Sequence, residues 1–305
     1  MCYSSAPRRR SYHYPTIPSH GRFFAARTTL ALGGDLPVSR LGFGAMRITG
    51  PGLYGPPADR PAMLALLRRA VELGVTFIDT ADMYGPFVSE ELIAEALHPY
   101  PAGLVVGTKG GVVRYGPGQE VLLDGTPQHL HEALAGSLRR LKLERLDLYQ
   151  LHRLDPRVPA ERTLAALAQA QQQGLVRHLG LSEVSVEDIQ LAQQHFQVAS
   201  VQNRYSLFDR AAEPVLAYCR AQGIAFIPWF PIGGGQVQET DALQQVAERH
   251  QVSVRQVALS WLLHHAPNVL PIPGTTSLTH LAENMHALRL ALTAADMRTL
   301  DALGH

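Results

Sequence analysis

The chain has 305 residues, of which 46% are hydrophobic and 17% are charged. This length suits two ordinary domains or one large α/β barrel, and the composition supplies a full core and argues against a disordered chain. The formal net charge of +1 gives no reason to expect a nucleic acid or a membrane surface as a partner. No run of 18 apolar residues occurs, so no membrane-spanning helix is predicted.

The two cysteines, Cys2 and Cys219, make no disulfide framework, which favours a reducing, cytoplasmic location. The first 26 residues are basic and rich in Ser, Pro and Tyr, and they lack the apolar segment that a secretory signal requires. We interpret residues 1–26 as a disordered extension, with an organelle transit peptide as the alternative. A folded domain is predicted over residues 27–305.

The first predicted element is a β-hairpin. Residues 28–41 alternate between polar and apolar and carry Gly33-Gly34, which predicts a hairpin that plugs the bottom of a barrel. Amphipathic segments with apolar residues three and four apart follow, and they predict helices. Three of these segments end at Gly74, Gly174 and Gly223, directly before a β-rich run. Glycine is favoured there because a left-handed helix cap is easiest without a Cβ atom.

Eight β-rich runs separate the helical segments. They cover residues 41–46, 75–79, 104–109, 146–152, 176–182, 199–203, 224–229 and 269–272. Alternation of strands and helices predicts a parallel sheet covered by helices, and eight such units predict an α/β fold of the (β/α)8, or TIM, barrel type. A last helix, capped by Thr293 with Asp296 three residues later, is predicted after the eighth unit. The doubly wound dinucleotide fold is the rival, but its G-x-G-x-x-G motif between a strand and a helix is absent.

Polar side chains stand at the ends of three consecutive predicted strands. Asp79 ends the second strand, Lys109 the third and His152 the fourth, and Tyr84 lies in the loop after the second. The carboxyl ends of barrel strands meet at one rim, where active sites are built. A phenol, an ammonium, a carboxylate and an imidazole at one rim suit proton transfer to a carbonyl oxygen or from an alcohol.

Each of these four residues has a distinct expected role. The ammonium of Lys109 is expected to lower the pKa of Tyr84, and Asp79 is expected to hold Lys109 in place. His152 would orient or polarise a substrate carbonyl. Any one of them alone has an ordinary structural explanation, but their convergence favours a shared function. The 14 histidines show no zinc-binding spacing, so no metal site is predicted.

The chain resembles the aldo-keto reductase family. The family's motifs are matched in order, over roughly residues 28–304, by LGFGAMR, FIDTADMYG with SEELIAEAL, TKGG, LDLYQLHRLD, HLGLSEVS, VQNRYSLFDR, PWFPIGGG and IPGTTSLTHLAENM. The resemblance implies a (β/α)8 barrel that binds NADPH in extended form and transfers hydride from the nicotinamide to an aldehyde or ketone. It also implies that Tyr84 donates the proton, with Asp79, Lys109 and His152 in support.

The resemblance assigns cofactor contacts as well. Ser182 and Gln202 match residues that hydrogen-bond the nicotinamide carboxamide, and Trp229 matches the ring that stacks on the nicotinamide. Glu183 stands where much of the family has Asn, and a carboxylate can accept from the amide but cannot donate to it. Ile232, Gly233 and Gly234 match positions where backbone amides approach the pyrophosphate, and Phe230 and Pro231 are further implied cofactor positions. The positions implied near the adenosine 2′-phosphate are Gly274, Thr275, Thr276, Ser277, His280, Glu283 and Asn284.

The cofactor choice has an alternative. Many relatives hold the 2′-phosphate with a lysine and an arginine, but this chain has Gly274 and His280 at those positions. The hydroxyls of Thr275, Thr276 and Ser277 and the amides of a helix N-terminus are the remaining donors. We expect NADPH, with NADH as an open second cofactor.

The substrate prediction depends on the loops. The loop ITGPGLYGPPADR after the first strand resembles that of a bacterial subgroup that includes pyridoxal reductases, which implies pyridoxal as the first substrate to test. Met46, Tyr54 and Met83, with Trp229 and Phe230, are expected to form an apolar wall for a planar aldehyde.

Two other functions stay open at this point. One is a regulatory, non-catalytic NADPH-binding subunit of the same fold, and the other is a Schiff-base aldolase that uses Lys109. The expected partner is a small-molecule carbonyl compound, and the expected assembly is a monomer or a weak oligomer.

Overall fold

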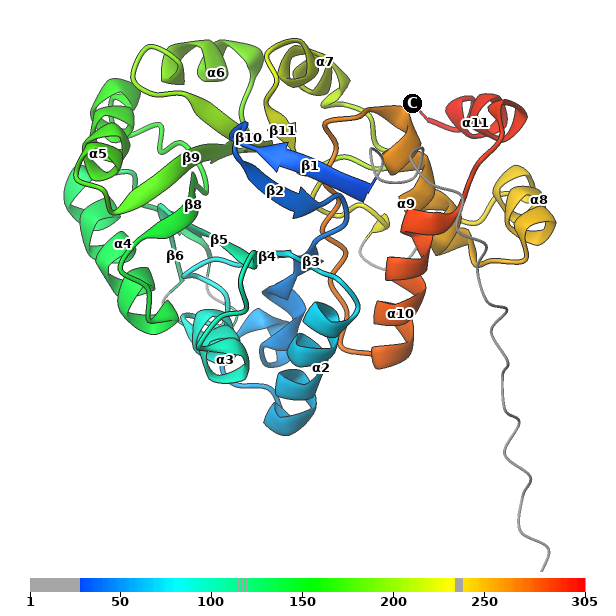
Figure 1. Cartoon of the computed structure of the whole chain (residues 1–305). Coiled ribbons are helices and arrows are strands. Elements are labelled where there is room, and N and C mark those ends of the chain that lie inside the picture. Colours follow the sequence, from blue (N-terminus) through cyan, green and yellow to red (C-terminus); the bar gives the residue numbers. More distant parts are fainter. Residues whose placement is uncertain (1–27, 115, 117, 119, 234–237, 305) are drawn as a thin grey trace, which may run out of the picture.

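The structure, a computed structural model, describes residues 28–114, 116, 118, 120–233 and 238–304. Figure 1 looks into a ring of strands that is surrounded by helices. The predictions for Gly234 and for the extension at residues 1–26 lie outside the described residues.

Seven parallel strands form most of the ring, in the order β11-β10-β9-β8-β5-β4-β3. Their bounds are Phe43–Gly44 (β3), Phe77–Asp79 (β4), Val105–Gly110 (β5), Leu146–Leu151 (β8), Val176–Ser182 (β9), Val198–Gln202 (β10) and Ala225–Phe226 (β11). The eighth predicted strand closes the ring through isolated contacts. Phe226 pairs with Val269 in parallel, and the Gly42 amide donates to the Pro271 carbonyl at 2.9 Å. The predicted (β/α)8 barrel is confirmed.

Ten α-helices are described. They are α2 (Arg60–Glu72), α3 (Val88–Leu97), α4 (Pro127–Leu141), α5 (Ala160–Gln172), α6 (Val186–Ala192), α7 (Glu213–Ala221), α8 (Asp241–His250), α9 (Val254–His265), α10 (Leu278–His286) and α11 (Ala294–Asp301). Gly74, Gly174 and Gly223 follow α2, α5 and α7 with φ of 95°, 77° and 68°, so the three predicted caps are confirmed. The last helix, α11, begins at the predicted Thr293 cap, whose side chain accepts from the Asp296 amide.

The predicted N-terminal hairpin is confirmed. It consists of β1 (Thr29–Leu32) and β2 (Leu36–Ser39), which pair in antiparallel fashion and cross one end of the ring in Figure 1. Leu32, Leu36 and Val38 share an apolar cluster with inward-facing side chains of the strands, among them Phe77 and Leu148. The hairpin therefore closes the end of the barrel at which the strands begin.

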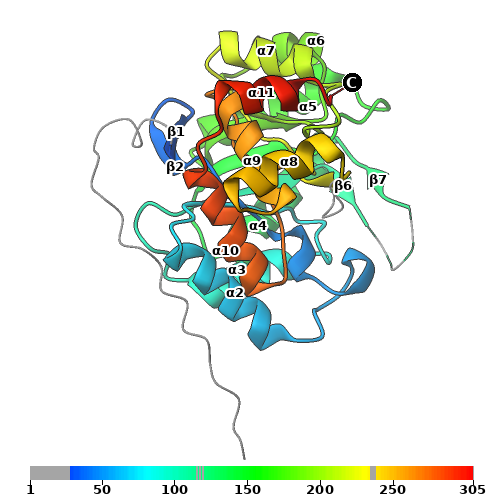
Figure 2. The ribbon, with the colours of Figure 1, turned by 90° about the vertical axis from the view of Figure 1, so that its right-hand side faces the viewer.

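A second hairpin, which the sequence did not predict, lies at the opposite end of the molecule in Figure 2. It consists of β6 (Val112–Val113) and β7 (Leu122–Leu123) and follows β5 directly. A larger apolar cluster fills the space between the strands and the surrounding helices. None of the described helices has the length and apolar character needed to span a membrane.

Candidate active site

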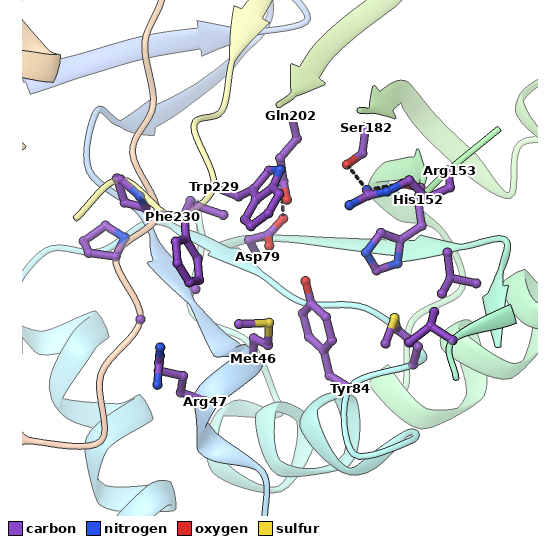
Figure 3. A pocket seen from close by; sticks show the side chains of 18 of the residues that line it. Met46, Arg47, Asp79, Tyr84, His152, Arg153, Ser182, Gln202, Trp229 and Phe230 are labelled. Carbon is purple, nitrogen blue, oxygen red and sulfur yellow. Dashed lines mark hydrogen bonds between the residues drawn. The ribbon is translucent and has the colours of Figure 1, made fainter. Parts of the chain in front are cut away.

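The four residues predicted at the strand ends come together in the structure. Asp79 ends β4, Lys109 lies near the end of β5, His152 follows β8, and Tyr84 lies in the loop after β4. All four are buried, and Lys109 is fully so. Asp79, Tyr84 and His152 line a cavity of about 410 Å³ at this rim of the barrel (Figure 3).

Lys109 lies at the centre of a hydrogen-bond network. Its Nζ donates to Asp79 Oδ2 at 2.7 Å and to the Thr80 carbonyl at 2.8 Å, and it lies 3.4 Å from the Tyr84 hydroxyl. The other carboxylate oxygen of Asp79 accepts from Gln202 Nε2 at 2.9 Å and from Gln150 Nε2 at 3.3 Å. The carboxylate is therefore held from both sides, and it directs the ammonium toward the phenol.

Burial changes the acid–base properties of this pair. Burial alone would lower the pKa of Lys109, but Asp79 and Tyr84 together outweigh it and raise that pKa above its usual value. Burial raises the pKa of Tyr84, and the opposing effect of Lys109 is smaller. Lys109 does lower the pKa of Tyr84, as expected, but the loss of water around the phenol outweighs this effect and Asp79 adds to the rise, so the net shift is upward. Tyr84 stays protonated at neutral pH.

His152 is a neutral imidazole in this setting. Burial, together with the nearby charges of Lys109 and Arg153, holds its pKa well below the usual range. Its ring meets the Tyr84 ring edge-on, with centroids 6.0 Å apart. Its buried Nδ1 has no hydrogen-bond partner among the described residues. The two side chains thus offer hydrogen-bonding groups beside one another in the cavity.

The cavity wall differs in part from the prediction. Met46, Met83 and Trp229 line it as expected. Tyr54 does not line it: its backbone pairs with Gly85, and the centroid of its ring lies 5.9 Å from the Arg114 guanidinium. Its place in the apolar wall is taken by residues of the β6–β7 region, Val112, Val121 and Leu123.

The residues assigned to the nicotinamide, and most of those assigned next to it along the cofactor, lie along the same cavity. It is lined by Ser182, Gln202, Trp229, Phe230, Pro231 and Ile232. Gly233 follows with a φ of 57° and is exposed. Glu183 does not line the cavity: its Oε1 accepts from the Trp229 indole at 2.5 Å and from the Arg204 amide at 2.7 Å. Glu183 therefore fixes the position of the indole through the hydrogen bond to its Nε1.

The residues assigned to the 2′-phosphate lie on one loop and the helix that follows it. Gly274 lines the cavity, and Thr275 Oγ1 accepts from the Ser277 amide at 3.0 Å. Ser277 caps α10 by accepting from the His280 amide at 3.3 Å. Thr276 and His280 are exposed at this helix start. The remaining two assigned residues, Glu283 and Asn284, lie further along α10.

Three polar side chains of the cavity or its network were missed in the sequence. Gln150 bonds Asp79, and the side chains of Arg47 and Arg153 line the cavity. Gln150 lies on β8 two residues before His152, which directly follows that strand, so the two-residue period of extended backbone places both on the same face. Arg153 directly follows His152. Arg47 lies in the short helical turn after β3, where the sequence pattern gave no signal.

The comparisons with known proteins agree with this geometry. Residues 40–305 match the Aldo/keto reductase family. An oxidoreductase of Schizosaccharomyces pombe is 47% identical over 272 residues, which cover 89% of this chain and 88% of that protein. Pyridoxine 4-dehydrogenase of Escherichia coli is 42% identical over 276 residues, covering 88% of this chain and 96% of that protein.

A solved structure extends the likeness to three dimensions. An aldo/keto reductase from Klebsiella pneumoniae, crystallised in complex with NADP and acetate, superposes with a TM-score of 0.75 at 27% sequence identity. The alignment covers 90% of this chain and 95% of that one. The chain therefore belongs to the aldo/keto reductase family, and it is an NAD(P)H-dependent oxidoreductase.

Proposed function

We propose that this protein reduces an aldehyde or ketone to the alcohol with NADPH, that Tyr84 donates the proton, and that pyridoxal is a substrate, with pyridoxine as its product. One observation carries the reaction class: a buried ammonium, fixed by Asp79 at 2.7 Å, lies 3.4 Å from the hydroxyl of Tyr84 in the cavity. The similarity to a pyridoxine 4-dehydrogenase supports the substrate.

The residues of the cavity fit the family's cofactor, NADP(H). The indole of Trp229, fixed through its Nε1, supplies a flat apolar surface for a nicotinamide. Ser182 and Gln202 carry the hydroxyl and amide needed for its carboxamide, and the N-terminus of α10 supplies amides and hydroxyls for a phosphate. When bound, the nicotinamide supplies the hydride.

The protein's own groups then handle the proton. A carbonyl oxygen placed between Tyr84 and His152 takes the phenolic proton, and the ammonium of Lys109 stabilises the phenolate that this leaves. Asp79 keeps Lys109 charged and in place throughout. His152, being neutral, donates a hydrogen bond to the carbonyl oxygen without adding a second positive charge beside Lys109.

The two alternative functions are less well supported. A Schiff-base aldolase needs an uncharged lysine, whereas Lys109 is fully buried, ion-paired with Asp79 and raised in pKa. A regulatory subunit would need no proton donor, and the intact arrangement of Tyr84 and Lys109 favours turnover.

A single substitution tests the proposal. Tyr84→Phe removes the phenolic proton and leaves the ring, so the rate of aldehyde reduction should fall by a factor on the order of 10²–10⁴. NADPH binding, followed by quenching of Trp229 fluorescence, should be retained. The assay should use a panel of aldehydes that includes pyridoxal, with NADPH and NADH in parallel. An unchanged rate in Tyr84→Phe would remove Tyr84 from this role, and borohydride trapping of substrate on Lys109 would favour the aldolase.

We also propose a cytoplasmic location and a monomer or weak oligomer. The described cysteine, Cys219, is buried and forms no disulfide. Fractionation of the source cells and sedimentation of the purified protein test these two points separately.

A further inference from the structure

A guanidinium group stands beside His152 in the cavity. Arg153 is half-buried and lines the cavity. Its Nη1 donates to the His152 carbonyl at 2.6 Å and to Ser182 Oγ at 2.9 Å. Within the described part of the chain, no carboxylate forms an ion pair with Arg153 and no hydrogen bond engages its Nε or Nη2. The side chain is thus fixed at one nitrogen, and its remaining N–H groups have no acceptor among the residues that the structure describes.

The charges around the cavity favour an anion. Asp79 is the acidic residue among those that line the cavity, and its charge is matched by Lys109 at 2.7 Å. Two guanidinium groups, those of Arg47 and Arg153, also line the cavity. Arg47 interacts with another group of the protein, whereas the Glu183 carboxylate acts on Arg153 electrostatically without forming an ion pair with it among the described residues. A partly desolvated cation is costly unless an anion accompanies it, so a ligand with a negative group should bind best here.

Arg47 and Arg153 lie at opposite ends of the cavity (Figure 3). Figure 3 shows Arg47 below Phe230 at one end and Arg153 above His152 at the other, with Tyr84 between them. The apolar residues Val112, Val121 and Leu123 line the same cavity as Arg153. A flat apolar ring that carries a negative oxygen would match this end.

We propose that Arg153 recognises an anionic oxygen close to the reacting carbonyl, so that the preferred substrates are planar aldehydes with an ionised oxygen two or three bonds from the carbonyl carbon. The inference depends on the proposed function, because it assumes a carbonyl bound between Tyr84 and His152. Arg153 and His152 are consecutive residues joined by a hydrogen bond, which places the anion beside the carbonyl and not across the ring. Aromatic aldehydes with a neighbouring hydroxyl belong to this class, and so does pyridoxal by its chemical structure.

Isomeric benzaldehydes test this position. The measurement is kcat/KM for 2-hydroxybenzaldehyde, 4-hydroxybenzaldehyde and 2-methoxybenzaldehyde with NADPH, in the full-length protein and in Arg153→Met. The wild type should prefer the 2-hydroxy compound over both others. Because a hydrogen bond to a charged group is lost, this preference should fall about tenfold or more in Arg153→Met. In Arg153→Lys, which keeps the positive charge but loses the planar guanidinium, the preference for the 2-hydroxy compound should lie between those of the wild type and Arg153→Met.

Arg47→Met is the matched control, because it removes a guanidinium from the other end of the same cavity. The ratios of kcat/KM among the three aldehydes should be the same in Arg47→Met as in the wild type. A separate experiment compares phenylglyoxylate with its methyl ester and shows whether a carboxylate can replace the phenolate. If the wild type has a higher kcat/KM for the acid than for the ester and Arg153→Met loses this preference, the result also supports the proposal. NADPH affinity of each variant is measured by Trp229 fluorescence, and circular dichroism confirms folding.

The outcomes separate the two proposals. If kcat/KM falls equally for all aldehydes in Arg153→Met, or if only the affinity for NADPH falls, Arg153 has no role in substrate choice. The proposed reductase function would then still stand. A wild-type protein that reduces none of the aldehydes with NADPH would overturn the proposed function, and this inference with it.

Discussion

Buried charge is the dominant feature at the scale of single residues. The strand-end positions of Asp79, Lys109 and His152 could be predicted, because each follows an apolar run and parallel strands end at one rim. The direction of the pKa shift of Tyr84 could not, because it depends on how completely the folded chain removes water from the phenol. The titratable groups of the site can be identified from the sequence, but their protonation states depend on how deeply the folded protein buries them.

Glu183 provides a prediction at this scale. Its Oε1 accepts from the Trp229 indole, so Glu183→Ala should free the indole and raise its quenching by acrylamide. NADPH affinity should fall severalfold as the ring loses its fixed position. Glu183→Gln keeps an acceptor oxygen and should change both quantities less. Trp261 is fully buried and provides a constant background, and Trp229→Phe identifies the signal. Identical quenching in the wild type, Glu183→Ala and Glu183→Gln would show that Glu183 does not position the Trp229 indole.

Asp82 provides a pH-dependent prediction. Burial, with the neighbouring charge of Glu90, raises its pKa to about 8, and its Oδ1 has no partner among the described residues. Between pH 4 and 8 the unfolded carboxyl ionises while the folded one keeps its proton, so stability falls as the pH rises through this window. The change approaches about 1.4 kcal/mol per pH unit. Asp82→Asn should therefore gain stability relative to the wild type from pH 5 to pH 7.5 in urea unfolding. A difference that does not vary with pH would show that Asp82 is ionised in the folded protein.

Local patterns were sufficient for most individual elements. The helix caps and the N-terminal hairpin follow from short-range preferences, so the glycines and capping residues predicted them. The β6–β7 hairpin was missed because each of its strands has only two residues, too few for a recognisable alternation. Its contribution to the cavity wall, which replaces the predicted Tyr54, depends on where the barrel places it.

The β1–β2 turn provides a prediction at the scale of elements. Gly33 and Gly34 both have positive φ, 63° and 88°, so alanine should cost about 1 kcal/mol at either position. A Cβ at Gly33 would also overlap the His178 ring, which is held by Asp35 at 2.6 Å, whereas Gly34 faces open space. Gly33→Ala should therefore lose about 1–3 kcal/mol more than Gly34→Ala in urea unfolding. The excess should disappear in a His178→Ala background; if it persists, the ring is not its cause.

Closure of the barrel is a property of the whole molecule. Arg40 is buried where the first strand region meets the last, and its Nη2 donates to the carbonyls of Leu263 at 2.9 Å and Ala266 at 2.8 Å. Arg40→Met should cost about 3 kcal/mol or more, because it leaves buried carbonyls without a donor. The control is Arg69→Met, which removes a half-exposed pair with Glu72 and should cost under about 0.5 kcal/mol. Equal losses in urea unfolding would show that Arg40 does not secure the closure.

The sequence by itself determined the fold class, the reaction class, the three strand-end residues and Tyr84 in the loop beside them, because these depend on periodicity and on the order of motifs along the chain. Only the tertiary structure decided the protonation of Tyr84 and His152, the turn of Glu183 toward Trp229, and the presence of Arg47 and Arg153 in the cavity. These features depend on desolvation and on contacts between residues far apart in the chain, and neither can be read from local pattern.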